Sequence, residues 1–102
     1  MSVRLVLLDR DGVLNEDRPD SVKNPDELRL IPGAGAAVAR LNRAGIKVAV
    51  CTNQSVVGRG IIAPEMLARI HATLAAGLAA CGGRLDAIFV CTDPPGAPSA
   101  RR

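Results

Sequence analysis

The chain has 102 residues, which is enough for one small domain and too few for two. Hydrophobic residues make up 48% and charged residues 23%, an ordinary balance for a globular fold that argues against disorder. Phe89 is the only aromatic residue, so the core must be aliphatic, and the stacking platforms used by binders of single-stranded nucleic acid are missing.

The charge and the lengths of the apolar runs limit which partners are possible. The net charge of +3 is scattered along the chain, which suits a small anionic ligand and not nucleic acid. No apolar run approaches the roughly 20 residues that span a bilayer. The apolar residues 1–8 are too short for a signal peptide and lead directly into Asp9. We therefore expect no membrane partner and a cytoplasmic location.

The first third of the chain predicts a strand, a long loop and a helix. Residues 3–8 (VRLVLL) form an almost continuous apolar run, typical of a strand that is buried on both faces of a parallel sheet. Residues 9–30 are polar and interrupted by Gly and Pro, which indicates a loop. Pro32-Gly33 then begins a helical pattern that ends at Gly45, a typical C-cap glycine.

The remainder predicts strand, loop, helix, strand and a tail. Residues 46–51 and 85–91 are apolar strands, and residues 52–62 form a loop. A helix begins at Pro64 and ends before Gly82-Gly83. His71 lies beside its apolar stripe, and we expect it on the surface or flank, far from the strand ends. The stripe consists of Met66, Leu67, Ile70, Leu74 and Leu78.

The three cysteines are odd in number and irregularly spaced, so no disulfide framework is predicted. Cys51 and Cys81 are predicted to be small core residues.

Strands that alternate with helices predict right-handed crossovers and a parallel sheet with helices on both faces. Ligands of such sheets bind outside the carboxyl ends of the strands. The residues that follow Leu8, Cys51 and Cys91 therefore matter most.

Two carboxylates directly follow the first strand, within the segment Asp9-Arg10-Asp11-Gly12. Gly12 permits a sharp turn, so both carboxylates can converge on one site. Such a pair suits metal-assisted phosphoryl transfer. One carboxylate attacks phosphorus, while the other, whose pKa its neighbour raises, donates a proton to the leaving oxygen. On spacing alone, a solvated Asp-Asp-Gly turn is the alternative.

A second polar motif, Thr52-Asn53-Gln54-Ser55, follows the second strand. Its hydroxyls and amides can bind phosphate oxygens through side chains and backbone N–H groups. Alone it could be a polar turn, but two polar motifs at adjacent strand ends favour a site.

The combination of DRDGVLN, TNQS and GRG resembles the first two motifs of haloacid-dehalogenase-type phosphatases. Within them the chain is similar to the heptose-bisphosphate and histidinol-phosphate phosphatases. The resemblance implies an incomplete α/β, Rossmann-like three-layer sandwich of about three strands and two helices. Residues 1–91 would be the N-terminal part of the phosphatase core, and residues 92–102 a loop or frayed tail.

The resemblance also implies roles for single residues. Asp9 would be the nucleophile that forms an aspartyl-phosphate, and Asp11 the general acid/base. Mg²⁺ would bind the Asp9 carboxylate and the Asp11 carbonyl. Thr52 would hold the phosphate group of the substrate. That substrate would be a phosphorylated sugar similar to heptose bisphosphate, or histidinol phosphate. The reaction would belong to carbohydrate metabolism. The residues implied to contact substrate are Asn53, Gln54, Ser55 and Arg59.

The sequence departs from the family pattern near its end. A charge-screening Lys in an Arg-Lys-Pro context and a later acidic pair are absent, and Arg101-Arg102 stand about where the Lys motif would begin. Lys47 is expected away from the site, which leaves Lys23 or Arg59 to supply charge. We therefore expect a truncated phosphatase with very weak turnover. The alternative is a non-catalytic fragment or a phosphate- or Mg²⁺-binding module.

Two further ligands are disfavoured. Cys91 matches the first ligand of the relatives' zinc loop, but Asp93 stands in place of its His and no cysteine follows, so zinc is not expected. The segment beginning at Gly33 has Val38 in place of the third glycine of a dinucleotide fingerprint, so a helix start is favoured.

In the family fold the first strand is central, but here the expected order is third, second, first. Residues 3–8 would then form an exposed apolar edge, which favours self-association.

Overall fold

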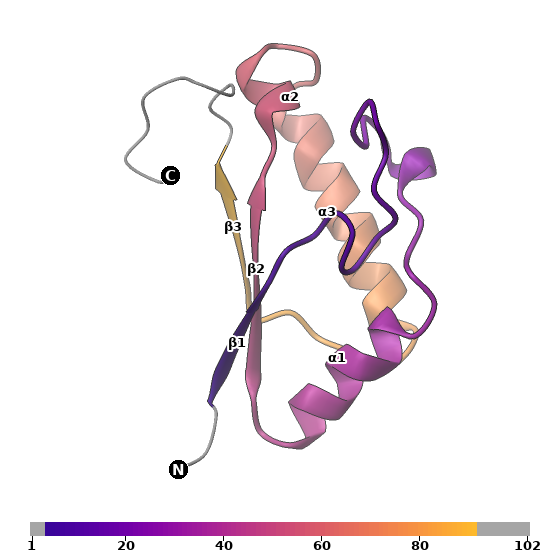
Figure 1. Ribbon diagram of the computed structural model, residues 1–102, viewed down its shortest axis with the longest axis vertical. Helices are drawn as coiled ribbons and strands as arrows, with labels where there is room; N and C mark the ends of the chain where they lie inside the picture. The colour runs from indigo at the N-terminus through magenta and orange to yellow at the C-terminus, as the bar shows by residue number, and fades with distance from the viewer. Residues whose placement is uncertain (1–3, 92–102) are drawn as a thin grey trace.

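The computed structural model describes residues 4–91 and shows an α/β fold (Figure 1). Three parallel strands alternate with helices, as the sequence predicts. In chain order the elements are β1 (Leu5–Leu8), η1 (Pro25–Glu27), α1 (Ala34–Arg43), β2 (Lys47–Asn53), α2 (Ser55–Gly58), α3 (Pro64–Ala79) and β3 (Ala87–Cys91). Residues 92–102, the expected tail, lie outside the described residues.

The sheet has the order β1-β2-β3, with both neighbouring pairs parallel. The register places Leu8 beside Val50, and Cys51 beside Phe89. The predicted strand order is confirmed, and β1 lies at one edge of the described sheet.

Both long helices, α1 and α3, cover the same face of the sheet (Figure 1). The expectation of helices on both faces is therefore wrong for the described residues. The two crossovers step in the same direction, from β1 to β2 and from β2 to β3. Because right-handed crossovers that step the same way lie on one side, both helices pack on one face.

The other face of the sheet, here called the open face, carries Leu5, Leu7, Cys51 and Phe89. Leu5, Leu7 and Phe89 are 55%, 61% and 57% exposed, and Cys51 is also exposed. Val6 and Leu8 of the same strand point to the helices and are partly buried. The expectations that the first strand is buried on both faces and that Cys51 is a core residue are therefore wrong within residues 4–91.

The core lies between the sheet and the two long helices, and it is aliphatic, as the composition requires. Val48 and Val50 of β2 pack with Val38 of α1 and with Leu74 and Leu78 of α3. The apolar stripe predicted on α3 is confirmed in its four buried members, Leu67, Ile70, Leu74 and Leu78. Leu14, from the loop after β1, joins this cluster and ties that loop to the core.

Two glycines, one after the end of α1 and one within it, have clear roles. Gly45 has φ +78°, and the N–H of the following Ile46 donates to the Leu41 carbonyl at 3.0 Å, which is the usual helix-ending arrangement. A Cβ on Gly35 would lie 2.6 Å from Cβ and Sγ of Cys81. Gly35 therefore allows α1 to approach the turn after α3. Cys81 itself is exposed, so the expectation of a core cysteine is wrong here too.

Two loop expectations need adjustment. β2 continues to Asn53 and is followed by the short helix α2, so within residues 52–58 only Gln54 lies outside a strand or helix. Within residues 9–30, η1 is capped by Asn24, whose Oδ1 accepts from the Glu27 N–H at 3.2 Å. Between residues 4 and 91, every helix is too short or too polar to cross a bilayer.

Candidate functional site at the carboxyl ends of the strands

The chain turns sharply after β1, and this turn positions the two predicted carboxylates. Asp9 is exposed directly after the strand, and Asp11 follows it in a partly buried position. Gly12 has φ +82°, and its N–H donates to the Asn15 carbonyl at 2.8 Å. A residue with a side chain is strained at this φ, which explains a glycine at this point.

The Asp11 carboxylate accepts hydrogen bonds from three side chains. At Oδ1 it accepts from Asn15 Nδ2 at 3.0 Å, from Arg10 Nη2 at 2.9 Å and from Arg10 Nε at 3.2 Å. At Oδ2 it accepts from Gln54 Nε2 at 2.9 Å. The same Gln54 nitrogen donates to Thr52 Oγ1 at 2.7 Å. The structure therefore brings the Asp9–Asp11 and Thr52–Gln54 motifs together at one edge of the sheet.

These contacts set the pKa of Asp11. Burial alone would raise it, but the hydrogen bonds from Asn15, Arg10 and Gln54 and the charge of Arg10 together hold it below its ordinary value. The expectation that a neighbour raises the pKa of Asp11 is wrong for this structure. The charged side chain that contacts Asp11 is a guanidinium, with an ion-pair distance of 2.9 Å.

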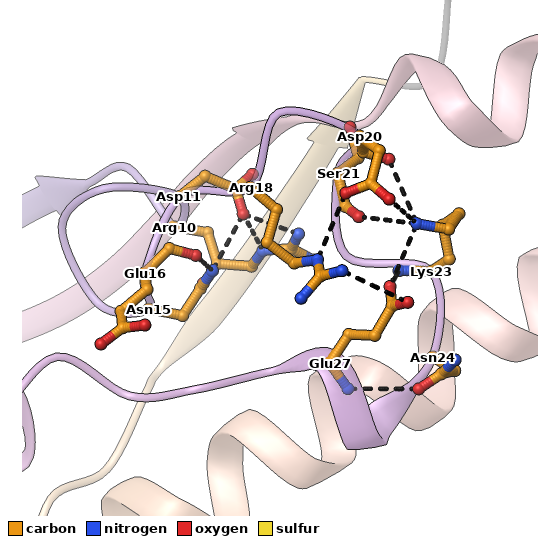
Figure 2. A network of polar contacts seen from close by, with 10 residues as sticks. All are labelled: Arg10, Asp11, Asn15, Glu16, Arg18, Asp20, Ser21, Lys23, Asn24 and Glu27. Carbon is orange, nitrogen blue, oxygen red and sulfur yellow. Dashed lines mark hydrogen bonds and ion pairs between the residues drawn. The ribbon is translucent and has the colours of Figure 1, made fainter.

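Arg10, which the sequence analysis did not single out, is fully buried. Its guanidinium lies against Asp11 (Figure 2), and Nη1 is 3.2 Å from Nε2 of His71 in α3. A signal for it existed in the sequence. Alternation along β1 turns Val6 and Leu8 toward the helices, and continuing this period by two residues turns Arg10 the same way.

His71 is half-buried, as a residue on the flank of the apolar stripe would be, but it contacts the site through Arg10, so the expectation that it lies far from the strand ends is wrong. Its position should have indicated this, because it is four residues after Leu67 and three before Leu74 on the buried side of α3. Burial, and secondly the charge of Arg10, lower the pKa of His71 to about 4.

Asn15 is the second residue that the sequence analysis missed. It is fully buried, and its Nδ2 donates both to Asp11 and to the Glu16 carbonyl, at 3.0 Å each. Its Oδ1 is buried without a hydrogen-bond partner in the described part of the chain. Asn15 therefore holds one oxygen of the Asp11 carboxylate, Oδ1, whereas Gln54 holds the other, Oδ2.

Comparisons with known proteins fit this arrangement, although no family model matches the chain. It is 44% identical over 93 residues to D-glycero-beta-D-manno-heptose-1,7-bisphosphate 7-phosphatase of Bordetella bronchiseptica, which covers 91% of this chain and 52% of that protein. A crystal structure of D,D-heptose 1,7-bisphosphate phosphatase from B. bronchiseptica, complexed with magnesium and phosphate, superposes with a TM-score of 0.93 at 43% identity. That match covers 98% of this chain and 56% of the other.

A structure from Mesorhizobium loti, assigned as a HAD-like phosphatase, matches with a TM-score of 0.82 at 32% identity, over 97% of this chain and 46% of that one. The chain is a relative of the haloacid-dehalogenase-like (HAD-like) phosphatases and carries part of their fold. The resemblance seen in the sequence is confirmed. This HAD-like chain spans about half the length of the curated relatives it matches.

The other predicted substrate residues of the HAD-like chain differ in their surroundings. Thr52 and Gln54 are buried, whereas Asn53 and Arg59 are exposed beside them in the sequence. Ser55 begins α2, but its side chain lies outside what the structure describes. The buried pair is held in place, and the exposed pair is free to contact a ligand.

Lys23 is not available to supply charge to the site. Its Nζ lies 2.7 Å from Asp20 and 3.3 Å from Glu27, and Arg18 lies against the same two carboxylates (Figure 2). The hydrogen bond to Asp20 is the main cause that raises the pKa of Lys23. These ion pairs connect residues of the loop after β1 to one another. Lys47 begins β2, at the end of the strand away from the site, as predicted.

The residues present fit part of a magnesium site. The Asp9 carboxylate and the Asp11 carbonyl are hard oxygen ligands of the kind that Mg²⁺ prefers, and Mg²⁺ retains water where protein ligands are few. Residues 4–91 contain no group of three or more His, Cys, Asp or Glu side chains that could hold a metal. The zinc-loop position Asp93 lies outside the described residues, as does the side chain of Cys91.

Proposed function

We propose that this chain forms the nucleophile- and phosphate-binding part of a Mg²⁺-dependent phosphatase that acts on a phosphorylated sugar of the heptose bisphosphate kind. The observation that carries the proposal is the hydrogen-bonded connection Asp11–Gln54–Thr52, which joins the two motifs beside the exposed Asp9. The substrate class is supported by the activity for which these relatives are named.

Asp9 is suited to attack phosphorus because its carboxylate is exposed at the end of β1. Its oxygen would form a bond to phosphorus as the bond from phosphorus to the sugar oxygen breaks, which leaves an aspartyl-phosphate. Water would then hydrolyse this intermediate and release phosphate. Mg²⁺, held by the Asp9 carboxylate and the Asp11 carbonyl, would neutralise negative charge on the phosphoryl group.

Asp11 is suited to proton transfer in both steps. Its lowered pKa makes it a carboxylate in the free chain, so it can accept a proton from the hydrolytic water. For the first step it must hold a proton to give to the sugar oxygen. A phosphate dianion beside it would raise its pKa, because like charge disfavours the ionised form.

Thr52 is oriented to bind the phosphoryl group. Its Oγ1 accepts from Gln54, so the hydroxyl hydrogen is left to be donated elsewhere. In this arrangement the Thr52 hydroxyl would donate to a phosphate oxygen at the carboxyl end of β2.

A second candidate function is a phosphate-binding module without appreciable turnover. Arg10 and Lys23 are both paired to carboxylates within the described residues, so neither offers a free charge. The charge-screening Lys of the family pattern is also absent from these 102 residues. The loss of one preorganised electrostatic contact of this kind reduces the rate by a factor of about 10²–10³. We therefore expect a polypeptide of these 102 residues to turn over well below about 1 s⁻¹, with Arg59 as the remaining source of charge.

The test is hydrolysis of heptose 1,7-bisphosphate, histidinol phosphate and p-nitrophenyl phosphate with and without Mg²⁺. Residual activity should require Mg²⁺ and vanish in Asp9→Asn, because an amide is a far poorer nucleophile. The matched control is Asp17→Asn, an exposed carboxylate on the same loop, which should retain activity. Hydrolysis that survives in Asp9→Asn would contradict the proposal, and phosphate binding without any hydrolysis would favour the binding module.

A further inference from the structure

Arg10 is a fully buried cation whose hydrogen-bonding groups are engaged on two sides. Nε and Nη2 donate to Asp11 Oδ1, and Nη1 faces His71 Nε2 at 3.2 Å. A buried guanidinium is costly unless its N–H groups find acceptors, so both contacts are needed for Arg10 to stay in place.

The chemistry of Arg10 decides the state of His71. A guanidinium has five N–H donors, no acceptor, and does not lose its proton in proteins. His71 Nε2 must therefore be the acceptor of the 3.2 Å contact, which places the ring hydrogen on Nδ1 of a neutral imidazole. The low pKa of His71 agrees with this state.

We propose that His71 is a positioning residue that acts through Arg10 on Asp11. The inference rests on the proposed function, in which Asp11 transfers the proton. With Nη1 held by α3, the guanidinium stays on Oδ1, and Oδ2 is left to Gln54. The carboxylate is thereby held in one orientation toward the end of β2. Without the acceptor on α3, Arg10 retains a buried unpaired donor and can turn away from Asp11.

Two substitutions separate this role from simple filling of space. His71→Gln can place an amide oxygen near the position of Nε2, so it retains the acceptor. His71→Leu keeps a side chain of similar bulk but removes the acceptor. Thr73→Ala, on the exposed side of the same helix, is the matched control.

The first measurement is NMR of the full chain at pH 7. Long-range ¹H–¹⁵N spectra should show His71 protonated at Nδ1 and not at Nε2. The Arg10 Nε–H signal and the Asp11 ¹³Cγ signal should shift in His71→Leu and stay near their original positions in His71→Gln and Thr73→Ala. A hydrogen on Nε2, or signals of Arg10 and Asp11 that do not change in His71→Leu, would overturn the inference.

The second measurement compares substrates with good and poor leaving groups. Proton donation matters most for a sugar phosphate and least for p-nitrophenyl phosphate, so His71→Leu should reduce kcat at least about 10-fold more for the sugar phosphate. His71→Gln should restore most of this difference, whereas equal losses on both substrates would indicate a general structural defect and contradict positioning. If the unsubstituted chain has no turnover, the proposed function fails, and the NMR measurement still decides the inference.

Discussion

At the scale of single residues, one buried guanidinium determines the electrostatics of the site. Arg10 lies between Asp11 and His71 and changes the pKa of both. Burial is the larger cause of the lowered pKa of His71, and the charge of Arg10 lowers it further by opposing a second positive charge. Burial raises the pKa of Asp11, but the hydrogen bonds from Asn15, Arg10 and Gln54 and the charge of Arg10 outweigh it. The result is a carboxylate beside a neutral imidazole at neutral pH, joined through a cation that solvent does not reach.

This arrangement predicts that stability depends on pH through His71. Its pKa is about 4 when folded against an ordinary value of 6.5, so between these values the unfolded chain binds a proton that the folded chain excludes. The free energy of unfolding should therefore rise as pH increases from about 4 to 6.5. Because His71 is only half-buried, we expect a contribution on the order of 1 kcal/mol after screening by solvent.

Urea denaturation at pH 4.5 and pH 7 measures this contribution. His71→Gln should remove most of the difference in unfolding free energy between the two pH values. Asp11 contributes to the pH dependence of stability only at lower pH. Its pKa in the folded chain is below the ordinary value of 3.8, so its stabilising effect is lost as the pH falls below that value. The same pH dependence in the parent chain and in His71→Gln would show that other groups cause it.

At the scale of elements, α1 and the turn after α3 approach closely at one small residue. A Cβ on Gly35 would lie 2.6 Å from Cys81 Cβ, an atom that is fixed to the backbone. A Cβ on Gly77 would lie equally close, at 2.6 Å, to Leu30 Cδ1, which is the tip of a flexible side chain. The two glycines of the helix pair therefore differ in how much their surroundings can adjust.

We predict that Gly35→Ala destabilises the fold and that Gly77→Ala has a smaller effect or none. An alanine gains up to about 1 kcal/mol in helix propensity over glycine, whereas overpacking against a rigid neighbour costs about 1–3 kcal/mol. The double variant Gly35→Ala/Cys81→Gly removes the obstructing Cβ and should recover part of the loss. Thermal unfolding of the four proteins measures these effects, and a Gly35→Ala variant as stable as the parent would contradict the packing described here.

At the scale of the whole molecule, the described sheet has one covered face and one open face. The open face carries exposed Leu5, Leu7 and Phe89, and β1 also presents an unpaired edge within residues 4–91. Open edges and exposed apolar residues both favour pairing with another chain.

We therefore propose that the 102-residue polypeptide self-associates through β1 and the open face. The double variant Leu5→Lys/Leu7→Lys should shift the sedimentation profile toward the monomer, because lysine on an edge strand opposes strand pairing. Ile61→Lys is the control, since Ile61 is a comparably exposed hydrophobic residue outside the sheet, at 52%. A monodisperse monomer of the unsubstituted chain at about 100 µM would contradict this proposal.

The sequence by itself determined the local elements and the motifs. The apolar stripe of α3, the strand at residues 5–8, the glycine that ends α1 and the polar residues after β1 and β2 all depend on patterns within a few residues, so they could be read in order. The strand order was expected from the family fold. The meeting of Asp11 with Thr52 and Gln54 followed because parallel strands bring their carboxyl ends to one edge.

The tertiary structure alone decided the electrostatics and the covered face. Arg10 and His71 are 61 residues apart in the sequence, and their contact exists only because the loop after β1 lies against α3. The pKa of Asp11 was predicted in the wrong direction because it depends on which side chains contact the carboxylate: the prediction considered only the second carboxylate, Asp9, whereas Asn15, Arg10 and Gln54 make the contacts. The apolar sequence of a strand likewise indicates that its side chains can be buried. Which of these side chains are buried depends on the face that the helices cover, and the handedness and direction of the two crossovers determine that face.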